Sequence, residues 1–384
     1  MKNIYLDYAA ATPIDARVLK KMMPYLRGNF GNASSAHKFG AKNREAIEDA
    51  RRIVAGQLGC RSSKIIFTSS GTEANNLALF SIMRSREDTS KKGHLVISAI
   101  EHKSIMAVAE RLEKEGNKVT RLKVNKEGLV DLKELADVVS KGVTLISIIY
   151  ANNEIGTIQN IKVISDLVKR YKKYTNYPLL HIDACQAPGL VEINVNKLGI
   201  DLMTLNGAKI YGPKGVGVLY RDINVNLSPM ILGGGQEMGM RSGTENVAAI
   251  VGFGEALKNA EQTRDINYKK ILIIKNYLIK KLFLAMPKVI INADSLYMLP
   301  TIINVCMDNI SSERLVLSLS KNGIYISSGS ACATNDDTGS YVLRAIGLRE
   351  KEAESSIRIS IGKYTTKHEI NALVNALKTE YLRK

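Results

Sequence analysis

Apolar runs of strand length alternate with segments of helical periodicity through the first two thirds of the chain. Strands are predicted at 64–67, 94–98, 143–149, 179–182 and 201–205. Helices are expected to begin near Thr72, Ser104 and Ile161. Regular alternation of this kind favours a mainly parallel sheet sandwiched by helices on both faces. The sequence therefore predicts an α/β fold.

The last third has a different pattern. A long helical stretch is expected from Glu245 to about Leu284. Beyond it, strands are predicted at 301–305, 324–326 and 356–360, and helices at 312–321 and 367–381. At 384 residues the chain exceeds the roughly 250–300 residues at which a single core stops growing. We therefore expect a large domain over 15–260 and a smaller α+β domain formed by 1–14 and 261–384.

Polar residues cluster directly after each predicted strand of the large domain. They are Ser69 to Thr72, Glu101 with His102, Asn152 to Glu154, Asp183 with Gln186, and Asn206 with Lys209. In open α/β sheets the ligand crevice lies outside the carboxyl ends of the strands. The sequence therefore predicts a site at this edge of the sheet.

Lys209 and Asp183 indicate what this site binds. An amine and a carboxylate, each at the end of its own strand, suit pyridoxal phosphate: the lysine holds it as a Schiff base and the carboxylate pairs with its pyridinium nitrogen. The alternatives are a surface lysine and an Asp that caps the following helix. The stretch 207–214 superficially resembles a P-loop, but no lysine directly follows Gly212, which argues against nucleotide binding.

Cys332 differs from the other three cysteines. It lies in a stretch of small residues, 327–334, whereas Cys60, Cys185 and Cys306 are expected to pack. A thiolate nucleophile needs access and a lowered pKa, so Cys332 is the candidate nucleophile. Without a C-x-x-C pair, neither a disulfide framework nor a zinc site is indicated. No resident metal is expected, and Cys332 is the one candidate for a transient iron–sulfur ligand.

Motifs spread over nearly the whole chain resemble those of class I cysteine desulfurases, which are pyridoxal phosphate enzymes of the class V aminotransferase family. The matching stretches are 5–10, 31–32, 70–73, 101–103, 152–156, 240–244 and the Cys332 loop. The resemblance implies fold type I, a homodimer, and removal of sulfur from L-cysteine to give L-alanine and a Cys332 persulfide. A sulfur acceptor is also implied, either an iron–sulfur scaffold or a tRNA-thiolation enzyme.

The resemblance also implies roles for individual residues. Lys209, Cys332 and His102 are the expected catalytic residues, and His102 is expected to stack on the cofactor ring. Cofactor contacts are expected from Gly71, Thr72, Asn153, Asp183, Gln186, Asn206 and Thr244, the last reaching the opposite subunit's cofactor phosphate. Asn32 and Arg358 are expected to bind the substrate carboxylate, although Arg358 on a strand also suits an ion pair within the sheet.

The chain departs from this family at one point. The usual Ser-Gly-His-Lys is Asn206-Gly207-Ala208-Lys209 here, so a histidine that binds the cofactor phosphate is missing. We therefore expect weaker cofactor binding.

Other activities are compatible with parts of this pattern. The nearest alternative is another class V enzyme, an aminotransferase or a selenocysteine lyase, although the Cys332 loop argues against the aminotransferase. A non-catalytic sulfur-relay or RNA-binding protein is a more distant one, which the presence of Lys209, Asp183 and Cys332 opposes.

Composition sets the remaining limits. The chain is 45% hydrophobic and 24% charged, as soluble globular proteins are. No run approaches the ~18 apolar residues of a membrane helix, and the first residues carry no signal-peptide core, so we expect a cytoplasmic protein. The net charge of +17 is attributed to a lysine-rich solvated surface rather than to direct nucleic-acid binding, because no basic cluster is interleaved with aromatics.

Overall fold

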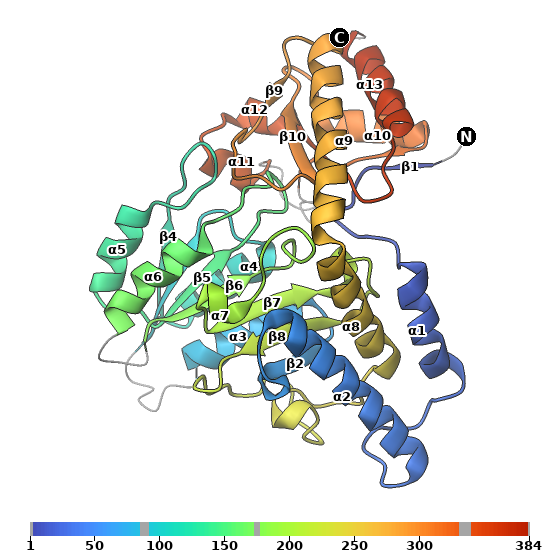
Figure 1. Cartoon of the computed structure of the whole chain (residues 1–384). Coiled ribbons are helices and arrows are strands. Elements are labelled where there is room, and N and C mark those ends of the chain that lie inside the picture. Colours follow the sequence, from blue (N-terminus) through green and yellow to red (C-terminus); the bar gives the residue numbers. More distant parts are fainter. Residues whose placement is uncertain (1–2, 85–91, 173–176, 330–338, 383–384) are drawn as a thin grey trace.

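A computed structural model describes residues 3–84, 92–172, 177–329 and 339–382. The first two thirds form a broad sheet with helices on both faces, and the last third lies beyond one edge of that assembly (Figure 1). The α/β architecture predicted from the alternating pattern is confirmed.

The large sheet has seven strands in the order β2-β8-β7-β6-β5-β3-β4. Their bounds are β2 Ile65–Thr68, β3 His94–Ser98, β4 Lys118–Leu122, β5 Leu145–Ile149, β6 Leu179–Asp183, β7 Leu202–Asn206 and β8 Gly217–Arg221. Strands β3 to β7 pair in parallel, whereas β8 runs antiparallel to both β2 and β7. The sheet is therefore mainly parallel, as predicted.

Successive residues of these strands pack on opposite faces, as strand geometry requires. Ile65 and Phe67 belong to one buried cluster, and Ile66 to another. The first cluster includes residues of α2, α5, α6, α7 and α8, and the second includes α3 and α4. The helices are α1 Ala16–Arg27, α2 Lys38–Leu58, α3 Gly71–Arg84, α4 Lys103–Lys114, α5 Leu132–Ser140, α6 Ile161–Tyr171, α7 Val195–Leu198 and α8 Val247–Gln262.

The last third builds a second buried core around short sheets. Its helices are α9 Arg264–Ala285, α10 Ser312–Lys321, α11 Tyr341–Ala345, α12 Glu350–Glu354 and α13 Lys367–Leu382. One sheet has the order β12-β10-β9, formed by β9 Ile290–Ile291, β10 Ile302–Cys306 and β12 Ser356–Ser360. The other pairs β1 Ile4–Tyr5 with β11 Ile324–Tyr325.

The N-terminal segment packs with this second core. Leu6 is fully buried among residues of α9, β10, β12 and α13, and β1 lies beside the C-terminal elements in Figure 1. This arrangement agrees with grouping 1–14 with 261–384, and the exact domain boundaries stay a prediction.

The helical stretch predicted from Glu245 to about Leu284 is present as two helices that meet at Thr263, where the backbone leaves the helical conformation. The Thr263 hydroxyl donates to the Asn259 carbonyl at 2.7 Å. The break lets α8 pack against the large sheet while α9 enters the second core.

Among the described residues, no helix is both long enough and apolar enough to cross a bilayer. Over the same ranges, no group of three or more His, Cys, Asp or Glu side chains is arranged to hold a metal ion.

Candidate active site

A cavity of about 250 Å³ opens at the carboxyl ends of the parallel strands. It collects most of the residues predicted from the sequence: Gly71, Thr72, His102, Asn153, Asp183, Gln186, Asn206, Lys209 and Arg358. Asn32 and Thr244 are exposed and do not line this cavity. Cys332 lies outside the described residues.

Lys209 ends a short 3₁₀ turn, Gly207–Lys209, that follows β7. Its Nζ donates to the carbonyl oxygens of Ala9 and Ala10 at 2.8 and 2.6 Å. The turn requires glycine at its start, because a Cβ on Gly207 would lie 2.6 Å from the Pro213 carbonyl oxygen. The N-terminal segment therefore holds the amine at the cavity wall.

Asp183 is the last residue of β6 and is 3% exposed. Its Oδ2 accepts from Asn75 Nδ2 at 2.8 Å, and its Oδ1 accepts from the Cys185 N–H at 3.0 Å. The next helix, α7, begins only at Val195 and is capped by Asn194. The helix-cap alternative for Asp183 is therefore wrong.

Asn75 was not predicted from the sequence. It lies one turn into α3, 1% exposed, and its Nδ2 also donates to Ser104 Oγ at 2.8 Å. Its Oδ1 is buried without a hydrogen-bond partner among the described residues. Because Asn75 lies four residues after Gly71, the helical repeat places it on the same side of α3 as the turn that is predicted to bind the cofactor phosphate.

His102 occupies the N-cap of α4, where Nδ1 accepts from the Ser104 N–H at 3.1 Å. This contact leaves Nε2 as the protonated nitrogen of the neutral ring. Burial lowers the pKa of His102, so the imidazole is neutral near pH 7. A neutral ring suits stacking on a cofactor.

The N-terminus of α3 provides the site for an anionic group. The first N–H groups of a helix have no intrahelical acceptor, and the helix dipole favours negative charge there. The backbone is closely packed at this point, since a Cβ on Gly71 would lie 2.7 Å from Cys185 Sγ. Opposite it, Asn206 Oδ1 accepts from the Ala208 N–H at 3.2 Å.

Arg358 lies on β12 and is 2% exposed. Its Nη2 donates to Asp7 Oδ1 at 2.7 Å and its Nη1 to the Asn153 carbonyl at 3.0 Å. Its Nε has no partner among the described residues. Arg358 therefore does form an ion pair, the alternative role considered for it. Its partner, Asp7, was not predicted from the sequence. The guanidinium group still lines the cavity.

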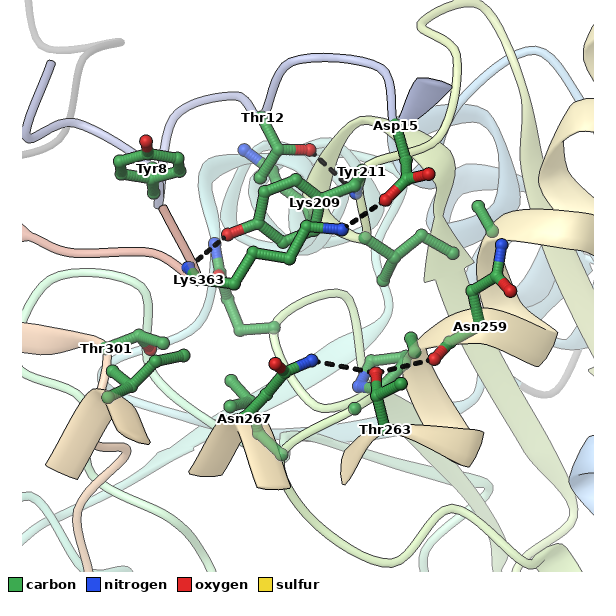
Figure 2. A pocket seen from close by; sticks show the side chains of 18 of the residues that line it. Tyr8, Thr12, Asp15, Lys209, Tyr211, Asn259, Thr263, Asn267, Thr301 and Lys363 are labelled. Carbon is green, nitrogen blue, oxygen red and sulfur yellow. Dashed lines mark hydrogen bonds and ion pairs between the residues drawn. The ribbon is translucent and has the colours of Figure 1, made fainter. Parts of the chain in front are cut away.

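A smaller cavity of about 70 Å³ lies behind Lys209 and shares Ala9, Gln186 and Lys209 with the first. Figure 2 shows Tyr8, Thr12 and Asp15 on one side of it, facing Asn259, Thr263 and Asn267. Two of its charged groups pair with each other, since Lys363 Nζ lies 2.6 Å from Asp15 Oδ2. The same Nζ lies 4.0 Å from the centre of the Tyr211 ring. Lys209 therefore stands in the wall between two cavities.

Two of the described cysteines, Cys306 and Cys60, pack as expected. Cys306 is buried in β10, and Cys60 packs beside the end of α2. Cys185 lines the larger cavity, and burial raises its pKa well above the ordinary value. A protonated Cys185 thiol is a poor nucleophile.

The residues at the larger cavity fit pyridoxal phosphate. They supply an amine, a buried carboxylate, a neutral imidazole and a helix N-terminus at one opening. The cavity is also lined by a buried arginine suited to a substrate carboxylate.

Comparison with known proteins agrees with this chemistry. The family model "Aminotransferase class-V" matches residues 4–373. The cysteine desulfurase IscS of Dictyoglomus turgidum is 39% identical, over 98% of this chain and 94% of its own length. A solved NifS-like protein is 34% identical, covers 100% of both chains and superposes with a TM-score of 0.92. The solved structure of SspA in complex with cysteine is 36% identical, covers 95% and 100% of the two chains and has a TM-score of 0.79.

Proposed function

This chain belongs to the class-V aminotransferase family, and we propose that it converts L-cysteine into L-alanine, leaving the sulfur as a persulfide on Cys332. It is a pyridoxal phosphate-dependent cysteine desulfurase, like relatives similar to it over nearly their whole length. The observation that carries the proposal is the convergence of Lys209, Asp183 and Arg358 on one cavity.

Lys209 and Asp183 would have different roles in handling protons during the reaction. Pyridoxal phosphate, when bound, supplies an acceptor for the electron pair left after the substrate Cα loses its proton. Lys209 Nζ would hold the cofactor and, once freed, take that proton. Asp183, oriented by Asn75, would keep the ring nitrogen protonated.

The other residues at the cavity would bind and orient the cofactor and the substrate. Gly71, Thr72 and Asn206 would hold the phosphate, and His102 would stack on the ring. Asn153 and Gln186 would hydrogen-bond the phenolic oxygen. The fork of Arg358 would take the substrate carboxylate, with Asn32 as a second contact.

Cys332 would accept the sulfur. Its thiolate forms an S–S bond with the substrate sulfur while the substrate Cβ–S bond breaks. The carbon side keeps the bonding electrons and takes up protons, which gives alanine. A reducing thiol then releases sulfide from the persulfide.

The enzyme would act as a homodimer. Thr244 is exposed on the single chain and away from the cavity, which agrees with a role at the opposite subunit's phosphate. Exposed apolar side chains nearby, Ile231 and Leu232, are suited to a subunit contact. The proposed sulfur acceptor is an iron–sulfur scaffold or a tRNA-thiolation enzyme in the cytoplasm.

One assay tests the proposal. The purified holoenzyme is incubated with L-cysteine and a reducing thiol, and alanine and sulfide are measured together. Equal amounts of both are expected from wild type and from Lys214→Ala, an exposed lysine in the neighbouring turn, and none from Lys209→Ala. Pyruvate or 3-mercaptopyruvate in place of alanine would contradict the proposal and favour a β-lyase or an aminotransferase. Comparing selenocysteine with cysteine as substrate tests the lyase alternative.

A further inference from the structure

We propose that Glu154 is a positioning residue for the sulfur-accepting step, because its carboxylate binds Ser340 and lies close to Gly329, the two residues that flank the stretch containing Cys332. The inference rests on the proposed role of Cys332. It concerns described residues only: Glu154 itself, and Gly329 and Ser340 on either side of 330–338.

The backbone of Glu154 is held in place by hydrogen bonds to neighbouring side chains. It lies in the turn after β5 and is 1% exposed. Its N–H donates to Asn152 Oδ1 at 2.8 Å, and its carbonyl accepts from Asn304 Nδ2 at 3.3 Å. Asn152 is itself anchored, since its Nδ2 donates to the Ile100 carbonyl at 2.9 Å. The backbone of Glu154 is therefore held both by the turn after β5 and by β10 of the second core.

Both chain ends approach this carboxylate. The Ser340 hydroxyl donates to Glu154 Oε2 at 2.6 Å and accepts from the Leu343 N–H at 3.2 Å, so it also caps α11. On the other side, a Cβ built on Gly329 would lie 3.8 Å from Glu154 Oε2 and 3.9 Å from the Ser340 Cβ. Ser340 is thus bonded to Glu154 Oε2, and the backbone of Gly329 lies near the same oxygen atom.

The same turn contacts the substrate-binding arginine. The carbonyl of Asn153 accepts from Arg358 Nη1 at 3.0 Å. Ser327 exchanges two backbone hydrogen bonds with Arg358, and its hydroxyl donates to the Gly329 carbonyl at 2.7 Å. Neighbouring residues 153 and 154 therefore link Arg358 to the ends of the cysteine-bearing stretch. This link would keep substrate sulfur and Cys332 in reach of each other.

The test separates substrate binding from sulfur transfer in the holoenzyme. Binding is followed as the cysteine-dependent change in the cofactor's visible absorbance, and transfer as sulfur on the Cys332 peptide by mass spectrometry in a single turnover. In Glu154→Ala and in Ser340→Ala, we expect transfer to slow by about tenfold or more, as the loss of a charge-assisted hydrogen bond implies. Cofactor content and the dissociation constant for cysteine should stay at wild-type values.

Three further variants test the same contact and its specificity. Ser340→Thr keeps both the hydroxyl and a helix-capping side chain, so it should transfer sulfur as wild type does. Because the two side chains act through one contact, the double alanine variant should be no slower than the slower single variant. Ser165→Ala is the matched control, since that buried hydroxyl bonds to the Gly199 carbonyl away from the cavity.

Wild-type transfer rates in both alanine variants would overturn the inference. Parallel losses of cysteine binding and transfer would also overturn it, since they would mark a merely structural role, and so would additive effects in the double variant. Absence of alanine from the wild-type reaction would instead overturn the proposed function, and with it this inference.

Discussion

The guanidinium of Arg358 forms a 2.7 Å ion pair with the carboxylate of Asp7. The two residues are 351 positions apart, and the pair joins the N-terminal segment to the wall of the larger cavity. A buried arginine needs a partner to offset its lost hydration. Asp7 therefore orients the fork that would receive the substrate carboxylate.

Replacing Asp7 should weaken substrate binding more than turnover. In Asp7→Ala the guanidinium group of Arg358 loses a hydrogen bond worth roughly 1.5–3 kcal/mol. The KM for cysteine should therefore rise by about tenfold or more. Asp7→Asn keeps an acceptor oxygen and should lie close to wild type. Steady-state alanine formation gives both constants. The control is Asp222→Ala, which removes the 2.7 Å ion pair with Lys64. An unchanged KM in Asp7→Ala would show that Asp7 does not orient Arg358.

Asp183 and Asn75 should affect rate rather than cofactor content. Preorganised charge at a reacting centre typically contributes several kcal/mol to the rate, so Asp183→Ala should lower kcat far more than cofactor occupancy. Asn75→Ala should show a smaller loss of the same kind, because it removes a 2.8 Å bond to Asp183. Asn76→Ala, whose side chain bonds to the Thr72 carbonyl, should be neutral. If occupancy and rate per bound cofactor fall equally in Asp183→Ala, the carboxylate has only a structural role.

Ala208→His should tighten cofactor binding. A hydrogen bond to a charged phosphate is worth about 1.5–3 kcal/mol, and this chain has Ala208 at the position where the resemblance described above implies a phosphate-binding histidine. The measurement strips the cofactor and titrates it back at fixed phosphate concentration. Ala208→Leu adds bulk without a donor and should not bind more tightly than wild type. A histidine variant no tighter than wild type would mean that neighbouring groups already satisfy the phosphate.

Glu101 should make folding stability depend on pH. It is fully buried, and burial raises its pKa to about 8, with nearby Asp183 adding to the effect. Between its ordinary pKa and about 8, the folded chain binds more protons at Glu101 than the unfolded chain, so its contribution to stability falls as the pH rises through that window. Glu101→Gln cannot ionise, and its stability relative to wild type should therefore rise between pH 5 and pH 8. Urea unfolding at both values measures this, and a constant difference would show that Glu101 is not held protonated.

Much of the fold could be predicted because burial imposes periodicity on the sequence. Apolar runs marked the central strands, but β4 has charged residues at Lys118 and Arg121 on the sheet edge and lacks such a run. Strand β8 follows a glycine-rich turn, and its antiparallel insertion between β2 and β7 is set by tertiary pairing. The break at Thr263 depends on two separate cores, which local periodicity does not encode.

The site was predictable where chemistry and strand ends coincide. Asp183 ends a strand, Lys209 and His102 each follow one, and all three carry a distinctive group. Asp7 and Asn75 were not predicted as site residues, because each is defined by a contact with a residue far away in the sequence. These contacts are with Arg358, 351 positions from Asp7, and with Asp183, 108 positions from Asn75. Such contacts appear only when the chain is folded.

A single turnover of the holoenzyme with sulfur-labelled L-cysteine, without a reducing thiol, shows whether the substrate sulfur passes to Cys332. We expect one alanine for each labelled sulfur recovered on the peptide that contains Cys332. Cys332→Ser should retain the cofactor and bind cysteine but form no alanine. Alanine formed at the wild-type rate by Cys332→Ser, or label recovered only as free sulfide from wild type, would show that Cys332 does not accept the substrate sulfur.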